Sequence, residues 1–179
     1  MRHPTENDAR VASDEELVYF APEDHFREEV AQLFEKVRSQ VLTLVPTADV
    51  QHVGSTAIPG SLTKGDLDVQ VRVTESEYSA AKAQLSKMYS VNLGGFAADD
   101  AISFEHSSSR PTLGIHLTVI GGSADIQWQF RDLLAASPAL REQYDQLKRK
   151  FEGGSMEEYR SAKAEFVSRA LHDRAAGRR

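Results

Sequence analysis

The chain contains no cysteine, which excludes disulfide bonds, thiol catalysis and thiolate ligation of metals, and fits a reducing compartment. It has no uninterrupted apolar run of about 18 residues and no apolar segment near Met1, so we expect neither a membrane span nor a signal peptide. Positive charge is scarce, because the formal net charge is −6 and basic residues cluster only at 174–179. These absences predict a cytoplasmic protein without membrane contact or strong nucleic-acid binding.

The length of the chain indicates how many domains it contains. With 179 residues, 40% of them hydrophobic, it has the size of one domain with a sizeable core. Residues 1–16 are polar and lack periodicity, so we expect a flexible lead-in there. The expected domain covers residues 17–172, and a basic tail follows at 173–179.

In the first half, apolar residues spaced by three and four predict helices, whereas apolar-polar alternation predicts strands. Pro46 ends the first helix, and Thr74 with Glu77 makes a capping box that opens the second. The expected elements are a helix over 26–44, strands over 48–53 and 66–73, and a helix over 74–88.

The second half contains two strand candidates, at 102–106 and 114–120, and from about residue 126 onward it is expected to be helical. Ser137 and Pro138 supply a helix start, and the glycines at 153–154 separate that helix from the last one. The order of elements predicts an α/β (α+β) fold, in which a small mixed sheet is flanked by helices and followed by a helical C-terminal part.

The candidate functional residues are a glycine-serine turn and two aspartates. Asp66 and Asp68 stand one residue apart at the start of a strand, so the period of two puts both carboxylates on one face, roughly 7 Å apart. Such a pair is stable in water, against basic groups or around a divalent cation. Gly54 and Ser55, which close the preceding strand, offer backbone N–H groups and a hydroxyl, as phosphate sites do. The pattern predicts an anion-binding turn beside a metal site.

The same residues have a structural interpretation. The glycine-serine pair is then a plain turn, and the aspartates form a solvated strand face that is paired with Lys64 and Arg72. His52 is expected to be a hydrogen-bonded strand histidine rather than a catalyst.

A longer motif resembles a known family. GrpB-like proteins, within the nucleotidyltransferase superfamily, typically carry a His-x-Gly-Ser-Thr-Ala-x-Pro-Gly run, then a lysine before an acidic strand, and later Phe-Arg-Asp, Tyr-x-x-Leu-Lys and Tyr-x-x-Ala-Lys segments. The matching residues here are His52, Gly54, Ser55, Thr56, Ala57, Pro59, Gly60, Lys64, Asp68, Phe130 to Asp132, Tyr144 to Lys148 and Tyr159 to Lys163. The resemblance spans about residues 18–171.

This resemblance implies a nucleotidyltransferase-like fold and nucleotidyl transfer from a nucleoside triphosphate to an unidentified small-molecule or protein acceptor. It implies that Asp66 and Asp68 hold Mg²⁺, or Mn²⁺ in its place. The phosphates are expected on Gly54, Ser55 and Thr56, with Lys64 as counter-charge. The residues expected on the acceptor side are Arg131, Lys148 and Lys163.

The chain departs from the superfamily at the third carboxylate, which is usually on the later strand, because residues 114–120 contain no acid. Glu105 is the expected substitute, and His116 is a neutral alternative that would favour Mn²⁺ or Zn²⁺. Two alternatives therefore stay open. The protein is a Mg²⁺-dependent nucleotidyltransferase, or it is a non-catalytic module that binds a nucleotide or a phosphometabolite. Likewise, Lys148 and Lys163 either contact substrate or dock the C-terminal helices on the sheet.

Overall fold

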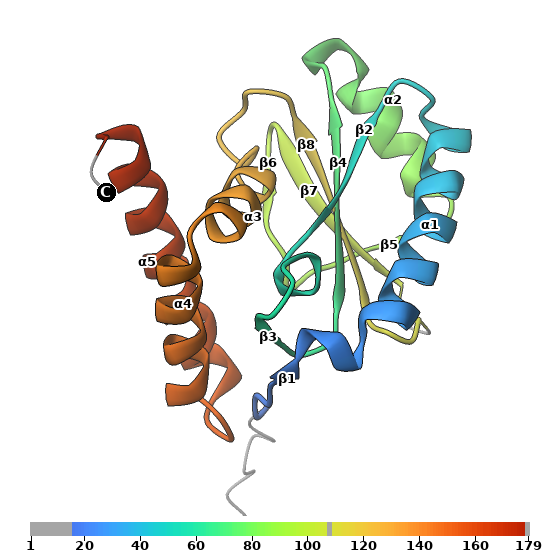
Figure 1. Cartoon of the computed structure of the whole chain (residues 1–179). Helices are drawn as coiled ribbons and strands as arrows, with labels where there is room; N and C mark the ends of the chain where they lie inside the picture. The colour runs from blue at the N-terminus through green and yellow to red at the C-terminus, as the bar shows by residue number, and fades with distance from the viewer. Residues whose placement is uncertain (1–15, 107–108, 178–179) are drawn as a thin grey trace, which may run out of the picture.

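The computed structural model describes residues 16–106 and 109–177, so the expected lead-in, apart from Glu16, lies outside the described residues. Figure 1 shows a twisted central sheet with two helices, α1 and α2, on one face and the three C-terminal helices, α3, α4 and α5, on the other side. The expected mixed sheet flanked by helices is confirmed.

The first half of the chain alternates short strands with two α-helices. The elements are β1 (Ala21–Pro22), the 3-10 helix η1 (Glu23–His25), α1 (Arg27–Leu44), β2 (Asp49–Val53), the 3-10 helix η2 (Ser55–Ala57), β3 (Leu62–Thr63), β4 (Leu67–Val73) and α2 (Glu75–Leu85). The capping box of Thr74 and Glu77 is present at the start of α2, which ends three residues before the expected Met88.

The second half contains the remaining strands and then the helical part. The elements are β5 (Ser90–Val91), β6 (Ala97–Ala98), β7 (Ala101–His106), β8 (Leu113–Val119), α3 (Gln127–Ala136), α4 (Pro138–Lys150) and α5 (Met156–Ala175). Ser137 caps α4 by accepting a hydrogen bond from the backbone N–H of Leu140. Helix α5 continues to Ala175, so the expected boundary of the basic tail at residue 173 falls inside a helix.

The strands of the main sheet follow the order β2-β4-β8-β7-β5, and β6 also pairs with β7. Strands β4 and β8 run parallel, and the other pairs are antiparallel. Strands β1 and β3 form a separate two-stranded pair. Strand β4, which begins directly after Asp66 and contains Asp68, therefore lies inside the sheet between β2 and β8.

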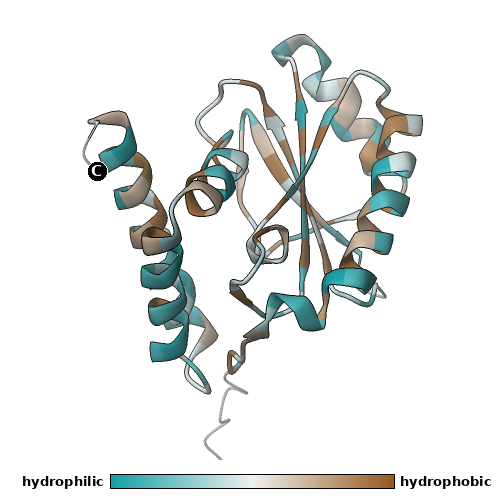
Figure 2. Ribbon diagram, viewed as in Figure 1, coloured by the Kyte–Doolittle hydropathy of each residue, from teal (hydrophilic) through white to brown (hydrophobic). Residues whose placement is uncertain are grey.

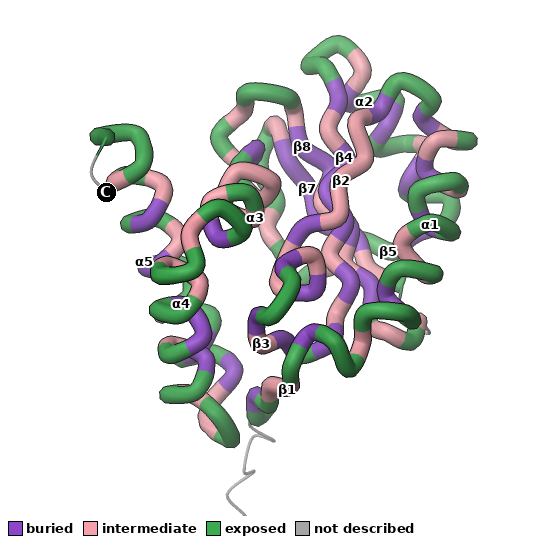
Figure 3. Tube along the Cα trace, viewed as in Figure 1, coloured by how far each residue is buried: buried purple, intermediate pink, exposed green. Residues whose placement is uncertain are grey.

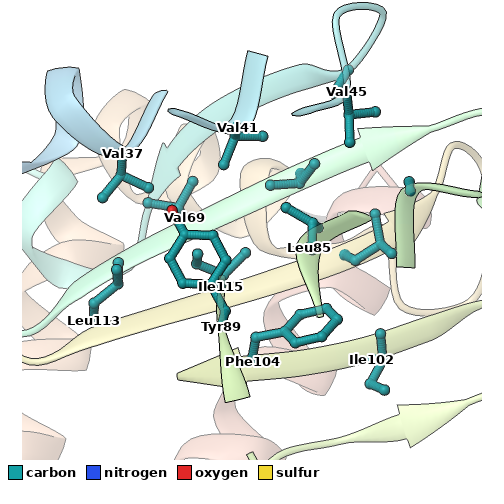
Figure 4. Packing of buried hydrophobic residues seen from close by; sticks show 14 of the residues in the cluster. Val37, Val41, Val45, Val69, Leu85, Tyr89, Ile102, Phe104, Leu113 and Ile115 are labelled. Atoms are coloured by element: carbon teal, nitrogen blue, oxygen red, sulfur yellow. The ribbon is translucent and has the colours of Figure 1, made fainter. Parts of the chain in front are cut away.

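The two faces of β4 have different roles because successive side chains point to opposite faces. Leu67, Val69, Val71 and Val73 are buried in one hydrophobic cluster with residues of α1 and α2. Figure 4 shows Val69 and Ile115 of the sheet next to Val37 and Val41 of α1. The other face of β4 carries Asp68, Gln70 and Arg72, and it is directed toward the C-terminal helices.

Polar contacts attach the start of α3 to this second face. The Arg72 guanidinium donates to both carboxylate oxygens of Asp125 and also pairs with Asp49. Gln70 donates to Asp125 as well, and its side-chain oxygen accepts from the backbone of Trp128. Burial opposes ionisation of Asp125, but its hydrogen bonds to Arg72 and Gly121 hold its pKa below the usual value.

A second hydrophobic cluster joins the C-terminal helices to the loop after β2. It includes Ile58, Leu134, Tyr144 and Phe166. Figure 2 shows a mostly hydrophilic α4, and Figure 3 shows that the exposed residues of α4 and α5 alternate with buried ones. Within the described residues, no helix combines the length and apolar character that crossing a membrane requires.

Candidate functional site

Two cavities meet where the turn after β2 faces helix α5. The main cavity has a volume of about 650 Å³, and its walls come from β2, β4, β8 and the C-terminal helices. The side cavity measures about 40 Å³ and includes Lys64 and Asp66. Ser55, Asp68 and Lys163 line both cavities. The turn and the acidic pair, separated by about ten residues in sequence, therefore share one site.

The glycine of the turn makes room for Asp68. Gly54 has φ 74° and ψ −175°, a backbone region that essentially only glycine occupies. A Cβ at Gly54 would lie 2.4 Å from Asp68 Oδ2, and a Cβ at Gly114 on β8 would lie 3.0 Å from Asp68 Oδ1. The Asp68 carboxylate thus occupies space that two glycines leave open.

Asp68 is paired with a histidine of the neighbouring strand. His116 Nε2 lies 3.5 Å from Asp68 Oδ1, and His116 Nδ1 lies 3.1 Å from Ser103 Oγ. Phe96 stacks on the imidazole at a centroid distance of 5.3 Å. Burial by itself raises the pKa of Asp68, but the hydrogen bond and charge of His116, with Lys163 and Lys64, outweigh burial and lower it. Asp68 is therefore an ionised carboxylate at the boundary of the two cavities.

The second aspartate is also engaged. Asp66 lies directly before β4 and forms an ion pair of 2.6 Å with Lys64, each side chain about one third exposed. Both aspartates line the side cavity, so they face the same space. Arg72, the other cation of the structural interpretation, pairs with Asp49 and Asp125 instead.

Thr56 acts within the turn rather than at a cavity wall. Its hydroxyl donates to the backbone oxygen of Asp66 at 2.9 Å and lies 3.0 Å from His52 Nε2. His52 stacks on Phe34, and burial lowers the pKa of His52 to about 4. The structure thus shows the expected hydrogen-bonded strand histidine, and Thr56 ties the turn to the start of β4.

Lys148 is not among the described residues that line either cavity. Its side chain is completely buried, and its ammonium donates to Ser61 Oγ, to the backbone oxygen of Leu62 and to Asp145. Burial lowers its pKa to about 8. Two of these hydrogen bonds attach α4 to Ser61 and to Leu62 at the start of β3, and the third is to Asp145 within α4, so the ammonium is used in holding the helix rather than at either cavity.

The other expected acceptor-side residues are at the cavities. Arg131 lines the main cavity, where it donates to Gln51 and the backbone oxygen of His52 and also pairs with Asp132. Lys163 projects from α5 and lines both cavities. Arg131 therefore attaches α3 to β2, whereas Lys163 is the cation nearest the boundary.

The two candidates for a third metal ligand are placed differently. His116 lines the main cavity, whereas Glu105 lies in β7 opposite Gly114, which in turn lies opposite Asp68. The backbones at Glu105 and Asp68 are therefore two strand spacings apart, which is roughly 10 Å. Within residues 16–106 and 109–177, no three His, Asp or Glu side chains gather closely enough to hold a metal ion.

Two tyrosines add polar groups near the place where the two cavities meet. The hydroxyls of Tyr144 and Tyr159 lie 3.4 Å apart, and Ser55 is hydrogen-bonded to Tyr144. Burial raises the pKa of Tyr144 to about 12 and also raises that of Tyr159. Both remain neutral hydrogen-bonding groups beside the acidic pair.

The sequence reasoning missed the apolar walls of the main cavity. These include Phe96, Ile126, Val167 and Leu171. On α5, Ala164, Val167 and Leu171 recur at three and four residues, a spacing that equally well predicts a helix face packed in a core. No local signal separates these two cases.

The fold and site define a mixed α/β domain with an acidic strand beside a glycine-serine turn. The sequence model of the family described as GrpB protein matches residues 23–173. The chain therefore belongs to the GrpB family, as the motif resemblance predicts.

Relatives and solved structures agree with this assignment. A UPF0157 protein of Vibrio cholerae is 29% identical over 152 residues, covering 85% of this chain and 81% of the relative. A UPF0157 protein of Deinococcus radiodurans is 32% identical over 146 residues, covering 79% and 75%. The crystal structure of GrpB from Enterococcus faecalis superposes with a TM-score of 0.67 at 18% identity, covering 86% of this chain and 98% of that chain. This last match shows the fold.

A more distant match is the Cid1 poly(U) polymerase with MgGTP bound. It has a TM-score of 0.49 and 12% identity, over 69% of this chain and 40% of that chain.

Proposed function

We propose that the chain is a Mg²⁺-dependent nucleotidyltransferase that moves a nucleotidyl group from a nucleoside triphosphate to an acceptor. One observation carries this proposal: Asp66 and Asp68 line the same small cavity as Ser55, Lys64 and Lys163. Because the sheet and α5 both contribute to that cavity, the activity would belong to one domain over residues 17–172.

The donor set of the side cavity fits magnesium. Mg²⁺ prefers oxygen ligands and keeps several waters, so two carboxylates plus phosphate oxygens suffice. Asp66 and Asp68 would hold the ion, which when bound would neutralise charge on the triphosphate. Each aspartate already has one basic partner within the protein: Lys64 for Asp66 and His116 for Asp68.

The chain's own residues would orient the substrate. The Ser55 hydroxyl and the turn backbone at Gly54 would contact phosphate oxygens. Lys64 and Lys163, which both line the side cavity, would supply positive charge for the phosphates. Thr56 would act indirectly, by holding the turn against Asp66.

A second candidate is a non-catalytic module that binds a nucleotide or a phosphometabolite. The observation that favours it is the internal pairing of both acids. Asp66 forms an ion pair with Lys64 at 2.6 Å, and Asp68 lies 3.5 Å from His116 Nε2. A site whose carboxylates already have partners within the protein can bind a phosphate ligand without a metal-assisted reaction.

The test is pyrophosphate release from each nucleoside triphosphate in the presence of Mg²⁺ and pooled small-molecule and protein acceptors. We expect release by the wild type, and loss of at least about tenfold in Asp66→Asn and in Asp68→Asn. Asp24→Asn is the matched control, because Asp24 is exposed and outside both cavities. Triphosphate binding by calorimetry without any release, unchanged in both Asn variants, would favour the binding module.

A further inference from the structure

The main cavity is much larger and less polar than phosphate binding requires. Its volume of about 650 Å³ lies within the range of roughly 300 to 1,000 Å³ that is usual for small-molecule sites. Its apolar walls include Val53, Ile58, Ile126, Phe130, Val167 and Leu171. Ile126 is 36% exposed, so part of this apolar lining faces water. An apolar ligand would cover it.

One end of the main cavity is polar. Ser55, Asp68 and Lys163 lie there, where the side cavity begins. Lys163 is exposed, and among the described residues no hydrogen bond or ion pair engages its ammonium. Arg131 is committed to Gln51, His52 and Asp132. Arg160, the other arginine of the lining, pairs with Glu16. Lys163 is therefore the cation available to an anionic group of a ligand.

Gln127 also lines the main cavity, but its side-chain oxygen is buried away from the open space and has no hydrogen-bond partner among the described residues. The stacked pair of Phe96 and His116 adds flat apolar surface to the lining.

We propose that the main cavity binds a small amphipathic molecule, with an apolar body among the apolar walls and a single anionic end at Lys163. This molecule would be the acceptor, because its anionic end would lie beside Asp68, where the two cavities meet. An oxygen of that end would form the bond to the α-phosphorus of the triphosphate as the bond to the leaving pyrophosphate breaks. Its role as acceptor rests on the proposed function, whereas its binding does not. A polynucleotide fits poorly, since it would bring many phosphates to largely apolar walls.

The first experiment measures binding of 8-anilinonaphthalene-1-sulfonate, which has an apolar body and one anionic group, without nucleotide or Mg²⁺. We expect saturable binding to one site, weakened at least about tenfold by Ala164→Trp, which fills the cavity. The matched control is Ala175→Trp, an exposed alanine at the end of the same helix. Lys163→Gln should weaken binding several-fold. Equal affinity in all four proteins would overturn the proposal.

The second experiment uses straight-chain carboxylates as competitors of the probe. Affinity should rise about fourfold for each added methylene until the cavity is full, since each buried CH₂ contributes about 0.8 kcal/mol. This dependence should be lost in Ala164→Trp and kept in Ala175→Trp. Affinity that is independent of chain length would refute an apolar binding site.

Nucleotide competition separates this inference from the proposed function. If MgATP displaces the probe and is itself weakened by Ala164→Trp, the nucleoside occupies the main cavity and the inference is wrong. Simultaneous binding of MgATP and the probe supports it. Carboxylate binding that persists in a protein without pyrophosphate release would leave the binding site correct and the transfer reaction refuted.

Discussion

Replacement of Gly54 by alanine tests the close approach on which the site depends. The backbone at φ 74° and ψ −175° costs a non-glycine residue about 1 to 3 kcal/mol. The new Cβ would also lie 2.4 Å from Asp68 Oδ2, so the carboxylate must move away from the turn, and overpacking adds about 1 to 3 kcal/mol. We expect Gly54→Ala to lower the free energy of unfolding by about 2 to 6 kcal/mol.

Gly60 in the same loop provides the control. Its φ is 78°, but a Cβ there would meet no atom within 4 Å, so Gly60→Ala should cost only the backbone strain of about 1 to 2 kcal/mol. Urea denaturation, followed by the fluorescence of Trp128, the single tryptophan, measures both losses. Equal losses in the two variants would refute the argument that Gly54 exists to accommodate Asp68.

A double-mutant cycle tests whether the Asp68 carboxylate causes the extra loss of stability in Gly54→Ala. In an Asp68→Ala background the carboxylate is gone, and the cost of Gly54→Ala should fall close to that of Gly60→Ala. If the cost of Gly54→Ala is the same in both backgrounds, the close approach to Asp68 is not its cause.

Two further predictions concern buried charges outside the turn. Burial lowers the pKa of Lys148 from 10.5 to about 8, so between these values the unfolded chain binds more protons and stability rises with pH. Urea denaturation from about pH 7 to about pH 10 should show this rise, up to about 3 kcal/mol, in the wild type and not in Lys148→Met. Asp125→Ala removes the bidentate partner of the Arg72 guanidinium, which keeps Asp49 and the face of Trp128. This change should cost about 3 kcal/mol, and a thermal midpoint that is unchanged would contradict it.

Much of the fold follows from local sequence patterns. The three- and four-residue spacing of Val30, Leu33 and Val37 predicted α1, and the alternation in β4 predicted a strand with one apolar face. Capping residues predicted the starts of α2 and α4. These signals depend on contacts within one or two turns or along one strand, so they can be read without the tertiary structure. Short pairs such as β1 with β3 carry too few residues for a pattern, and the sequence did not predict them.

The site was predicted in part for the same reason. Asp66, Asp68 and Ser55 belong to one short motif, and its spacing placed them together, as the shared side cavity shows. Thr56 belongs to the motif as well, yet its hydroxyl is used by the backbone of Asp66. Residue type and spacing locate a side chain but do not say which of its hydrogen bonds are already made.

The sequence by itself determined the family, the succession of helices and strands, and the meeting of the turn with the acidic strand. Only the tertiary structure decided what distant residues do. Lys148 is committed to Ser61, 87 positions away, and Glu105 is kept from Asp68 by the width of β8. Apolar residues of α5 line a cavity instead of a core. Such outcomes depend on how the C-terminal helices pack against the sheet, and that packing arises from many weak contacts between segments that have no common local pattern.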